Sequence, residues 1–372
     1  MLISPPAWKP VVKGVLLATL AGSASASAAQ ATPAPQDATR PIIATLTPDP
    51  DSWGQIGFVN VPKFPFDGTP GSAIKKPPLG PTSKTIFQSP EAGPDSTLPV
   101  GQLIHLEYLP TFTSKMPPAE QVSHYHEFYE WGYTLAGDAI MPEPVHPDQV
   151  NGMYYRKKEG GWLSRPPYSL HGGTLGTGGL RNQLPYDLII FEEGDGHVIN
   201  VGRNGQPGSY RGRDGGPPPP GVVGDYRKVE EFTRPWLLDS TRDVDWEEDR
   251  EVPGRFVKWL DDSRKMGFRS RLVKIPPGWK APAGWTRTYF EHANVMRYMV
   301  WGEMNVWRFK DPKDAGSPYL VGKDYFIYQP PRTIWGYGSG PVTERGAIWL
   351  EVTYAKGLKH GGGPIEEVKR LD

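Results

Sequence analysis

The alternation of side chains along SHYHEFYEWGYTLAG, Ser123 to Gly137, predicts a β-strand. Every second side chain of an extended chain points to the same face. One face of this strand therefore carries His124, His126, Phe128 and Glu130. Residues 131–134 continue the strand with mostly apolar side chains, and Gly137 is predicted to form the turn at its end. Two imidazoles and one carboxylate are thus expected to converge.

A second chemically interesting strand is predicted to begin at His171, in the sequence RPPYSLHGG. Pro166 and Pro167 stiffen the turn that leads into it, because the proline ring fixes the backbone angle φ. If this strand neighbours the first one, His171 adds a further ligand to the same site.

The two halves of the chain resemble each other. GGWLSRPPYSLHGG, Gly160–Gly173, aligns with KDYFIYQPPRTIWGY, Lys323–Tyr337, and YTLAGDAIM from Tyr133 aligns with YMVWGEMNV from Tyr298. The period of roughly 165 residues is far longer than a solenoid repeat, so the pattern indicates a duplicated domain.

Composition favours an all-β fold. The chain holds 44 Gly, 42 Pro, 13 Trp and 17 Tyr, which is typical of short strands joined by tight turns. It has no cysteine, so a metal must bind to His, Asp or Glu. Its 41 basic and 41 acidic residues, without long runs of one sign, favour neither nucleic acid nor a membrane surface as partner.

Further boundaries come from segment composition. Lys9 and Lys13, the apolar run Val15–Ala21 and small residues up to position 29 predict a signal peptide at 1–29 and an exported, periplasmic or secreted protein. Residues 30–97 read as a Pro/Gly-rich arm, disordered or extended, with a short strand at GQIGFVNV, and residues 203–245 as a linker. The globular domains are then expected at 98–202 and 246–372.

The motif spacing resembles that of the cupin superfamily. The first motif is His124-x-His126-x3-Glu130-x6-Gly137, and the second is Gly160-x5-Pro166-x4-His171. The resemblance implies two jelly-roll β-barrels, a bicupin, in which one divalent metal binds to His124, His126, Glu130 and His171. Fe, Mn, Zn, Ni and Cu all accept such ligands, so the identity of the metal stays open.

The second half departs from the ligand pattern. By the repeat alignment, the four ligand positions are taken by Tyr289, Glu291, Val295 and Trp335. The C-terminal domain is therefore expected to be a metal-free, degenerate cupin with a structural role.

The resemblance implies an enzyme that acts on a small organic molecule, with dioxygenase-type oxidation ahead of lyase, decarboxylase or isomerase chemistry. A non-catalytic small-molecule-binding protein is the alternative from another class, and a homo-oligomer is compatible with either. Tyr133 is a candidate catalytic base, although it also reads as a core position that matches Tyr298. Candidates for substrate binding are Phe128, Trp162 and Tyr168.

Overall fold

A computed structural model describes ten segments of the chain: residues 42–44, 51–63, 81–88, 99–106, 123–143, 153–172, 186–193, 199–201, 235–358 and 360–372. All of them lie in one compact unit, Ala34–Asp372. The predicted signal peptide lies outside the described residues. Within the described segments, no helix has the length and apolarity needed to cross a membrane.

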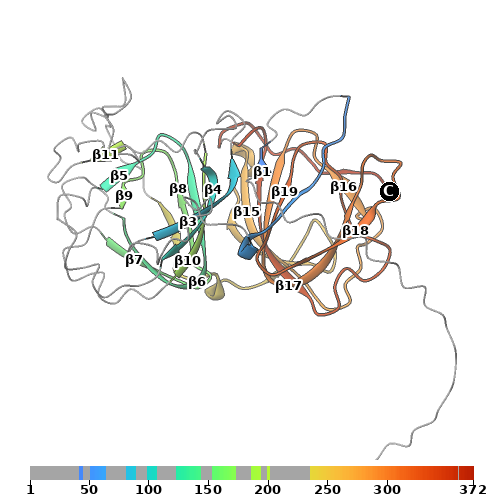
Figure 1. Ribbon diagram of the computed structural model, residues 1–372, viewed down its shortest axis with the longest axis horizontal. Coiled ribbons are helices and arrows are strands. Elements are labelled where there is room, and N and C mark those ends of the chain that lie inside the picture. Colours follow the sequence, from blue (N-terminus) through green and yellow to red (C-terminus); the bar gives the residue numbers. More distant parts are fainter. Residues whose placement is uncertain are drawn as a thin grey trace, which may run out of the picture. The chain divides into compact units, whose positions relative to one another are not determined.

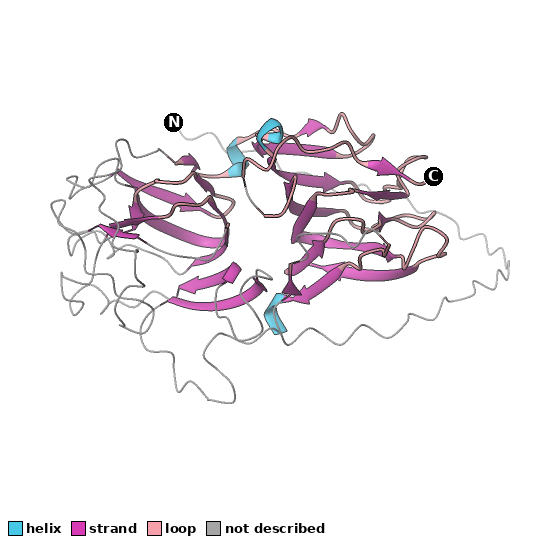
Figure 2. Cartoon of the chain, turned by 90° about the horizontal axis from the view of Figure 1, so that it is seen from above, coloured by secondary structure: helices cyan, strands magenta, loops and turns pink. Residues whose placement is uncertain are grey.

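Strands dominate both halves, and the predicted all-β fold of two jelly-roll barrels is confirmed (Figures 1 and 2). In the described residues of the N-terminal half, one sheet has the order β1 (Ile42–Ile43), β3 (Pro81–Gln88), β4 (Pro99–Leu106), β10 (Tyr186–Glu192), β6 (Glu130–Glu143), β8 (Trp162–Arg165), β12 (Trp236–Leu238). β7 (Met153–Lys158) pairs with β6, and a second sheet has the order β11 (Ile199–Val201), β5 (Ser123–Tyr125), β9 (His171–Gly172).

The C-terminal half repeats this arrangement. Its sheet has the order β13 (Glu247–Glu248), β14 (Phe256–Asp261), β15 (Phe268–Ile275), β21 (Ala347–Tyr354), β17 (Asn294–Arg308), β20 (Trp335–Gly336), β16 (Arg287–Tyr289), β22 (Lys369–Arg370). β18 (Ser317–Gly322) and β19 (Tyr325–Gln329) also pair with β17, and β2 (Gly57–Asn60) pairs with β19. The described 3-10 helices are η1 (Val61–Lys63), η7 (Thr241–Asp243) and η8 (Arg264–Met266).

Each half receives an outer strand from the segment that precedes the other half. β12, which lies just before the C-terminal barrel in sequence, pairs with β8 of the N-terminal barrel. β2, which lies before the N-terminal barrel, pairs with β19 of the C-terminal barrel. The N-terminal sheet thus continues from β6 to β8 and β12, and the C-terminal sheet continues in the same way from β17 to β19 and β2. Main-chain hydrogen bonds of these outer strands link the two halves.

These strands change the predicted domain boundaries. The short strand predicted at GQIGFVNV exists as β2. β3 also lies in the segment predicted as an arm, yet it is antiparallel to β4 and therefore part of the N-terminal barrel. β12 likewise lies within the predicted linker. Proline and glycine density marks these segments as irregular but does not exclude short outer strands.

The repeat extends to fine details of the backbone. In each half the central strand has an irregularity at the matching point, where β6 skips Leu135 against β10 and β17 skips Val300 against β21. Gly137 does not end its strand as predicted: β6 continues to Glu143, and Gly137 marks the point where its partner changes from β10 to β7. Its left-handed φ of 75° recurs at Gly302, with φ 77°, where β17 passes from β21 to β18. A left-handed conformation carries no steric penalty at glycine.

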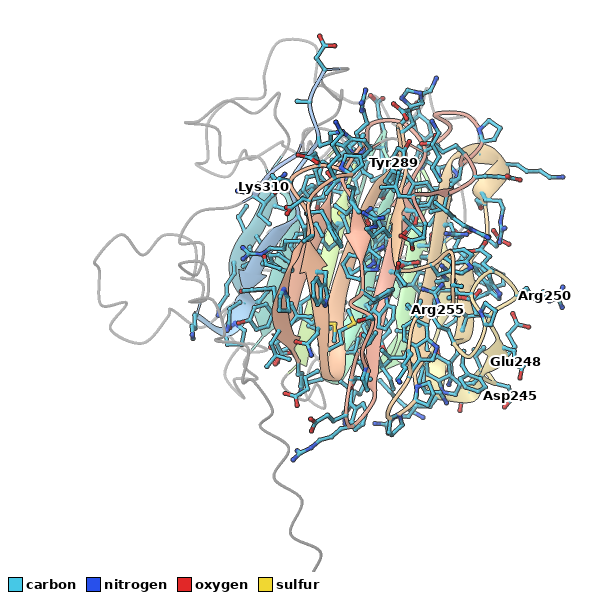
Figure 3. The ribbon with its side chains drawn as sticks, turned by 90° about the vertical axis from the view of Figure 1, so that its right-hand side faces the viewer. Asp245, Glu248, Arg250, Arg255, Tyr289 and Lys310 are labelled. Atoms are coloured by element: carbon cyan, nitrogen blue, oxygen red, sulfur yellow. The ribbon has the colours of Figure 1, made fainter. Side chains whose placement is uncertain are left out.

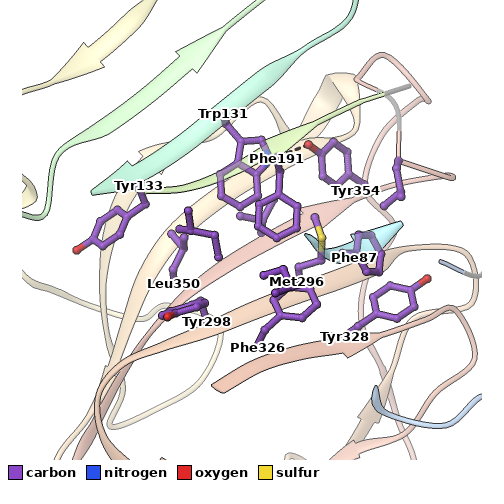
Figure 4. Packing of buried hydrophobic residues seen from close by; sticks show 14 of the residues in the cluster. Phe87, Trp131, Tyr133, Phe191, Met296, Tyr298, Phe326, Tyr328, Leu350 and Tyr354 are labelled. Atoms are coloured by element: carbon purple, nitrogen blue, oxygen red, sulfur yellow. Dashed lines mark hydrogen bonds between the residues drawn. The ribbon is translucent and has the colours of Figure 1, made fainter. Parts of the chain in front are cut away.

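One apolar cluster joins the two halves (Figure 4). Trp131 and Phe191 of the N-terminal half stack with ring centroids 4.4 Å apart, and the indole N–H of Trp131 donates to the hydroxyl of Tyr354, 2.8 Å away. Burying each large aromatic side chain contributes roughly 1.5–3 kcal/mol. A separate cluster, which includes Val273, Met299 and Trp349, fills the interior of the C-terminal barrel.

Candidate metal centre

Three side chains of the N-terminal barrel converge in its interior. His171 opens β9, Glu130 opens β6, and His126 lies just after β5. The single strand predicted over Ser123–Gly137 is in fact two strands, because a bend at residues 127–128 separates β5 from β6. All three side chains are buried, with 2–3% of each residue exposed.

The ligand atoms of these residues meet at one point. Nε2 of His126 lies 2.9 Å from Oε2 of Glu130, and Nε2 of His171 lies 3.4 Å from the same oxygen. The two Nε2 atoms are 3.2 Å apart. Among the described residues, this trio is the group that meets the geometric requirements of a metal site.

The spacing of the three atoms fits a divalent ion. Bonds of about 2.0–2.1 Å to nitrogen and oxygen place adjacent ligand atoms roughly 2.9 Å apart at 90° and roughly 3.4 Å apart at a tetrahedral angle. The observed separations of 2.9, 3.2 and 3.4 Å fall within this interval. Two imidazoles and one carboxylate are also a donor set that divalent transition metals accept.

Arg165 holds the second carboxylate oxygen. It lies directly across from Glu130 in the β6–β8 pair, and its Nη1 contacts Oε1 of Glu130. Burial opposes the charge of Glu130, but the charge of Arg165 and a hydrogen bond from His126 outweigh it, so the pKa of this carboxyl lies well below its usual range. Glu130 is therefore ionised, and its Oε2 is directed to the two histidines.

His171 is held in the form that binds metal. Its Nδ1 lies 2.9 Å from the carbonyl oxygen of Ser169, which can only accept, so Nδ1 carries the proton. Burial, together with the positive charge of Arg165, lowers the pKa of His171. The ring is thus neutral, with the lone pair of Nε2 directed at Glu130 and His126.

The fourth predicted ligand is placed by its backbone. His124 pairs with His171 in the antiparallel β5–β9 ladder and with Asn200 in the β5–β11 ladder. The side chain of His124 lies outside the described part of the structure, so its role stays a prediction.

The predicted substrate-binding residues separate. The ring of Phe128 lies beside His126, with centroids 4.5 Å apart, and is in place to form a wall next to the ligands. Tyr168 is 38% exposed, and its ring lies 5.9 Å from that of Tyr125. Trp162 is wrong as a pocket residue, because it is fully buried in the cluster between the halves, where it stacks on Trp131.

Tyr133 is wrong as a catalytic base for the same reason. Side chains alternate along β6, so Tyr133 faces the opposite side from Glu130. It lies in the cluster between the halves, as does its repeat mate Tyr298, and its hydroxyl is 3.5 Å from Oγ1 of Thr241. The alternative assignment of both tyrosines to matching core positions is the one that the structure supports.

The C-terminal barrel carries other chemistry at the equivalent positions. β16 pairs Thr288 with Trp335, so Thr288, rather than the predicted Tyr289, takes the place of His124. The discrepancy arises because Thr288 precedes Val295 by seven positions, whereas His124 precedes Glu130 by six. The ring of Trp335 occupies the place of His171 and lies under the guanidinium of Arg297, 3.8 Å from Cζ to the ring centroid.

Arg165 is the site residue that the sequence interpretation missed. It stands directly before the Pro166–Pro167 turn, where the repeat has Gln329. The replacement of an Arg–Glu pair by Gln329 and Val295 at paired register positions could have revealed it, since both members differ together between the halves.

Searches of protein-family profiles and of curated proteins found no match to the chain. Similar solved structures include a protein of Nostoc punctiforme PCC 73102 described as a candidate dioxygenase, with 12% identity, a TM-score of 0.49, and coverage of 85% of this chain and 86% of that one. A Lactobacillus farciminis oxalate decarboxylase shows 11% identity, a TM-score of 0.43, and coverage of 79% and 85%. Procruciferin, an 11S globulin of Brassica napus, shows 10% identity, a TM-score of 0.45, and coverage of 78% and 83%. No activity is transferred from these proteins to the chain at this level of similarity.

Proposed function

We propose that this two-barrel chain of the cupin type is a metal-dependent enzyme that acts on a small organic molecule in its N-terminal barrel. The observation that carries the proposal is the meeting of Nε2 of His126, Nε2 of His171 and Oε2 of Glu130 within 2.9–3.4 Å of one another. His124 is included as a fourth ligand, because cross-strand partners of an antiparallel ladder share one face and its partner is His171.

Dioxygenase-type oxidation is the reaction that we favour. The three described ligands, two imidazoles and one carboxylate, are the set typical of non-haem iron(II) oxygenases, and His124 as a fourth ligand still leaves open positions on a six-coordinate ion. A lyase, decarboxylase or isomerase reaction is the alternative if the ion is manganese, zinc or nickel. When bound, the ion supplies Lewis acidity or, as iron, a binding place for dioxygen.

The residues of the chain prepare the site in three ways. Arg165 fixes the carboxylate of Glu130 so that one oxygen faces the ion. The carbonyl of Ser169 fixes the protonation of His171. Phe128 covers His126 and limits access of water from that side.

Metal analysis of the purified protein tests the ligand set. We expect about one equivalent of metal per chain, and a large loss in His126→Ala, Glu130→Gln and His171→Ala, because each removes a ligand. His292→Ala is the matched control, since His292 is exposed and belongs to the C-terminal half. Arg165→Met is expected to lower metal affinity by roughly 10–100-fold, as is usual for outer partners of ligands.

A protein that contains no metal, and whose metal content does not respond to these variants, would contradict the proposal. In that case the three side chains form a hydrogen-bonded cluster of the barrel interior, with no ion at its centre.

Oxygen uptake tests the dioxygenase reaction. With catechol-like and keto-acid substrates, we expect uptake in the native protein and none in His126→Ala. Metal content without turnover across the panel would favour the alternative, a metal-stabilised protein that binds a small molecule.

We also propose that the protein is exported after removal of residues 1–29. The support is the order of Lys9, Lys13, the apolar run and the small residues in the sequence. Mass spectrometry of the protein recovered from the periplasm or medium is expected to show a first residue near Ala29 or Gln30. An intact N-terminus on a protein retained inside the cell would contradict this.

A further inference from the structure

A cavity of about 260 Å³ lies where the two halves meet, away from the metal centre. Its walls come from η1, β3, the irregular part of the β6–β10 pair, the irregular part of β17 and the β18–β19 turn. Leu135 follows Glu130 by five positions along β6, a separation of roughly 16 Å at about 3.3 Å per residue. None of the metal ligands lines this cavity.

The two strand irregularities shape the apolar wall. Leu135 and Val300 are the residues that β6 and β17 skip against their neighbours, and both line the cavity together with Ala136. Such irregularities re-aim side chains and are common next to functional sites. Their occurrence at matching positions of both halves places two aliphatic side chains on one hollow.

The remaining wall is polar and carries charges of both signs. Lys84 and Lys323 contribute ammonium groups, and Asp187 and Asp324 contribute carboxylates. The hydroxyl of Tyr298 donates to Oδ1 of Asp324, 3.3 Å away, and Nζ of Lys84 donates to the carbonyls of Val61 and Pro62. Lys84 and Asp324 are thus each held in place by hydrogen bonds to the surrounding structure.

Burial affects the ionisation of two of these groups. It raises the pKa of Asp324 and lowers the pKa of Lys84, in each case by penalising the charged form. The charge of Asp187 opposes the shift of Lys84, and the charge of Lys323 opposes that of Asp324, so charges of both signs lie close together on this wall.

We propose that this cavity binds a small zwitterion of the α-amino-acid type with a branched aliphatic side chain. Because charges of both signs line one wall, a zwitterion meets an oppositely charged group at both of its ends, whereas a simple anion or cation is matched at one end only. Leu135, Ala136 and Val300 supply the surface for its side chain, and the volume suits a molecule of this size.

Calorimetric titration with three matched probes tests the charge requirement. L-leucine carries both charges, 4-methylpentanoate lacks the ammonium group, and 3-methylbutylamine lacks the carboxylate. We expect L-leucine to bind at least about tenfold more tightly than either of the others, since each loses a hydrogen bond to a charged group. Equal binding of the three, or no binding of L-leucine, would overturn the proposal.

Two variants locate the binding site. Asp324→Asn removes a charge but tolerates the left-handed backbone at this position, φ 66°, and Lys323→Ala removes an exposed side chain. Each is expected to weaken L-leucine binding by about tenfold, whereas Lys280→Ala, exposed and outside the cavity, is expected to leave it unchanged. Binding that both cavity variants leave intact would overturn the assignment. Metal content, measured in parallel, is expected to stay constant, so failure here is distinguishable from failure of the metal site.

Discussion

The two barrels carry different side chains at equivalent backbone positions: a charged pair in one and an uncharged pair in the other. In the N-terminal barrel, Glu130 and Arg165 face each other across β6 and β8. In the C-terminal barrel the matching pair is Val295 and Gln329. The same backbone thus supports a ligand cluster in one half and none among the described residues of the other, and the difference lies in a few inward-facing side chains.

Two residues further along, the contrast reverses. The N-terminal barrel has Gly132, which projects no side chain into the interior, whereas the C-terminal barrel has Arg297. Arg297 is buried and bonded to Glu351, 2.9 Å from Nε to Oε2. Arg271 meets the same carboxylate from β15, with Nη2 2.8 Å from Oε1. In the C-terminal barrel, an internal ion-pair network therefore fills the region that corresponds to the surroundings of the N-terminal cluster.

The network has its own electrostatic balance. Burial disfavours the charge of Glu351, but Arg271 and Arg297 outweigh this effect, and the pKa of Glu351 lies well below its usual range. Around it, Arg255 pairs with Asp249 and Arg269 with Glu251. Figure 3 shows Arg255 among the side chains of this half. In this half, the buried carboxylates are paired with arginines. In the N-terminal cluster, three potential ligand atoms point toward one another instead.

The largest expected effect comes from removing the charge of Glu351. Glu351→Gln leaves two buried arginines without their carboxylate, and we expect the free energy of unfolding to fall by roughly 3–5 kcal/mol. Urea denaturation measures this, and metal content is expected to stay at the native level. Glu344→Gln, at an exposed position, is the control and is expected to change stability by less than about 0.5 kcal/mol.

The matched change in the other barrel sharpens the comparison. Glu130→Gln is expected to lose metal and also to destabilise the fold, because Arg165 then lacks its partner. If Glu351→Gln in its folded state lost metal as completely as Glu130→Gln, the division of roles between the barrels would be wrong.

A smaller effect is expected at Trp335, the counterpart of His171. Trp335→Phe reduces ring volume and weakens the contact with Arg297, at an expected cost of roughly 1–3 kcal/mol in the free energy of unfolding. Trp335→His restores one ligand type, but Val295 and Thr288 offer no further imidazole or carboxylate. The carboxylate of Glu291 is already paired with Lys369, 2.8 Å from Oε2 to Nζ. We therefore expect no second equivalent of metal by elemental analysis, and a gain of one would refute the assignment of this barrel as metal-free.

Much of this contrast could be predicted from the sequence. The repeat alignment predicted the duplication and the different side chains at the ligand positions of the second half. Side-chain alternation predicted that His126 and Glu130 meet at one site, although a bend at residues 127–128 divides the single strand on which that prediction was based. The sequence could not show that β2 and β12 cross between the halves, because short strands in proline-rich segments have no distinctive pattern. These pairings depend on contacts distant in sequence.

Aromatic residues were the main source of error. Trp162 and Tyr133 stand close to the motif in sequence, but a strand of a barrel has two buried faces here, one toward the interior and one toward the other half. Apolar character alone does not distinguish them. Strand parity does distinguish them. Tyr133 lies three positions after Glu130 on β6, and Trp162 is the cross-strand partner of Tyr133, so both point to the outer face.

The smallest expected effects concern the paired tyrosines of the shared cluster. Burial raises the pKa of both Tyr133 and Tyr298, so each hydroxyl keeps its proton. Tyr298→Phe removes a donor from the carboxylate of Asp324, at an expected cost of about 1.5 kcal/mol or more. Tyr133→Phe removes only a long contact to a neutral hydroxyl, so about 0.5 kcal/mol is expected. Denaturation curves of the two variants measure the difference, and oxygen uptake of Tyr133→Phe is expected to equal that of the native protein. A strong loss of turnover with unchanged stability would return Tyr133 to the reaction, and with it the question of how an outward-facing side chain reaches the metal centre.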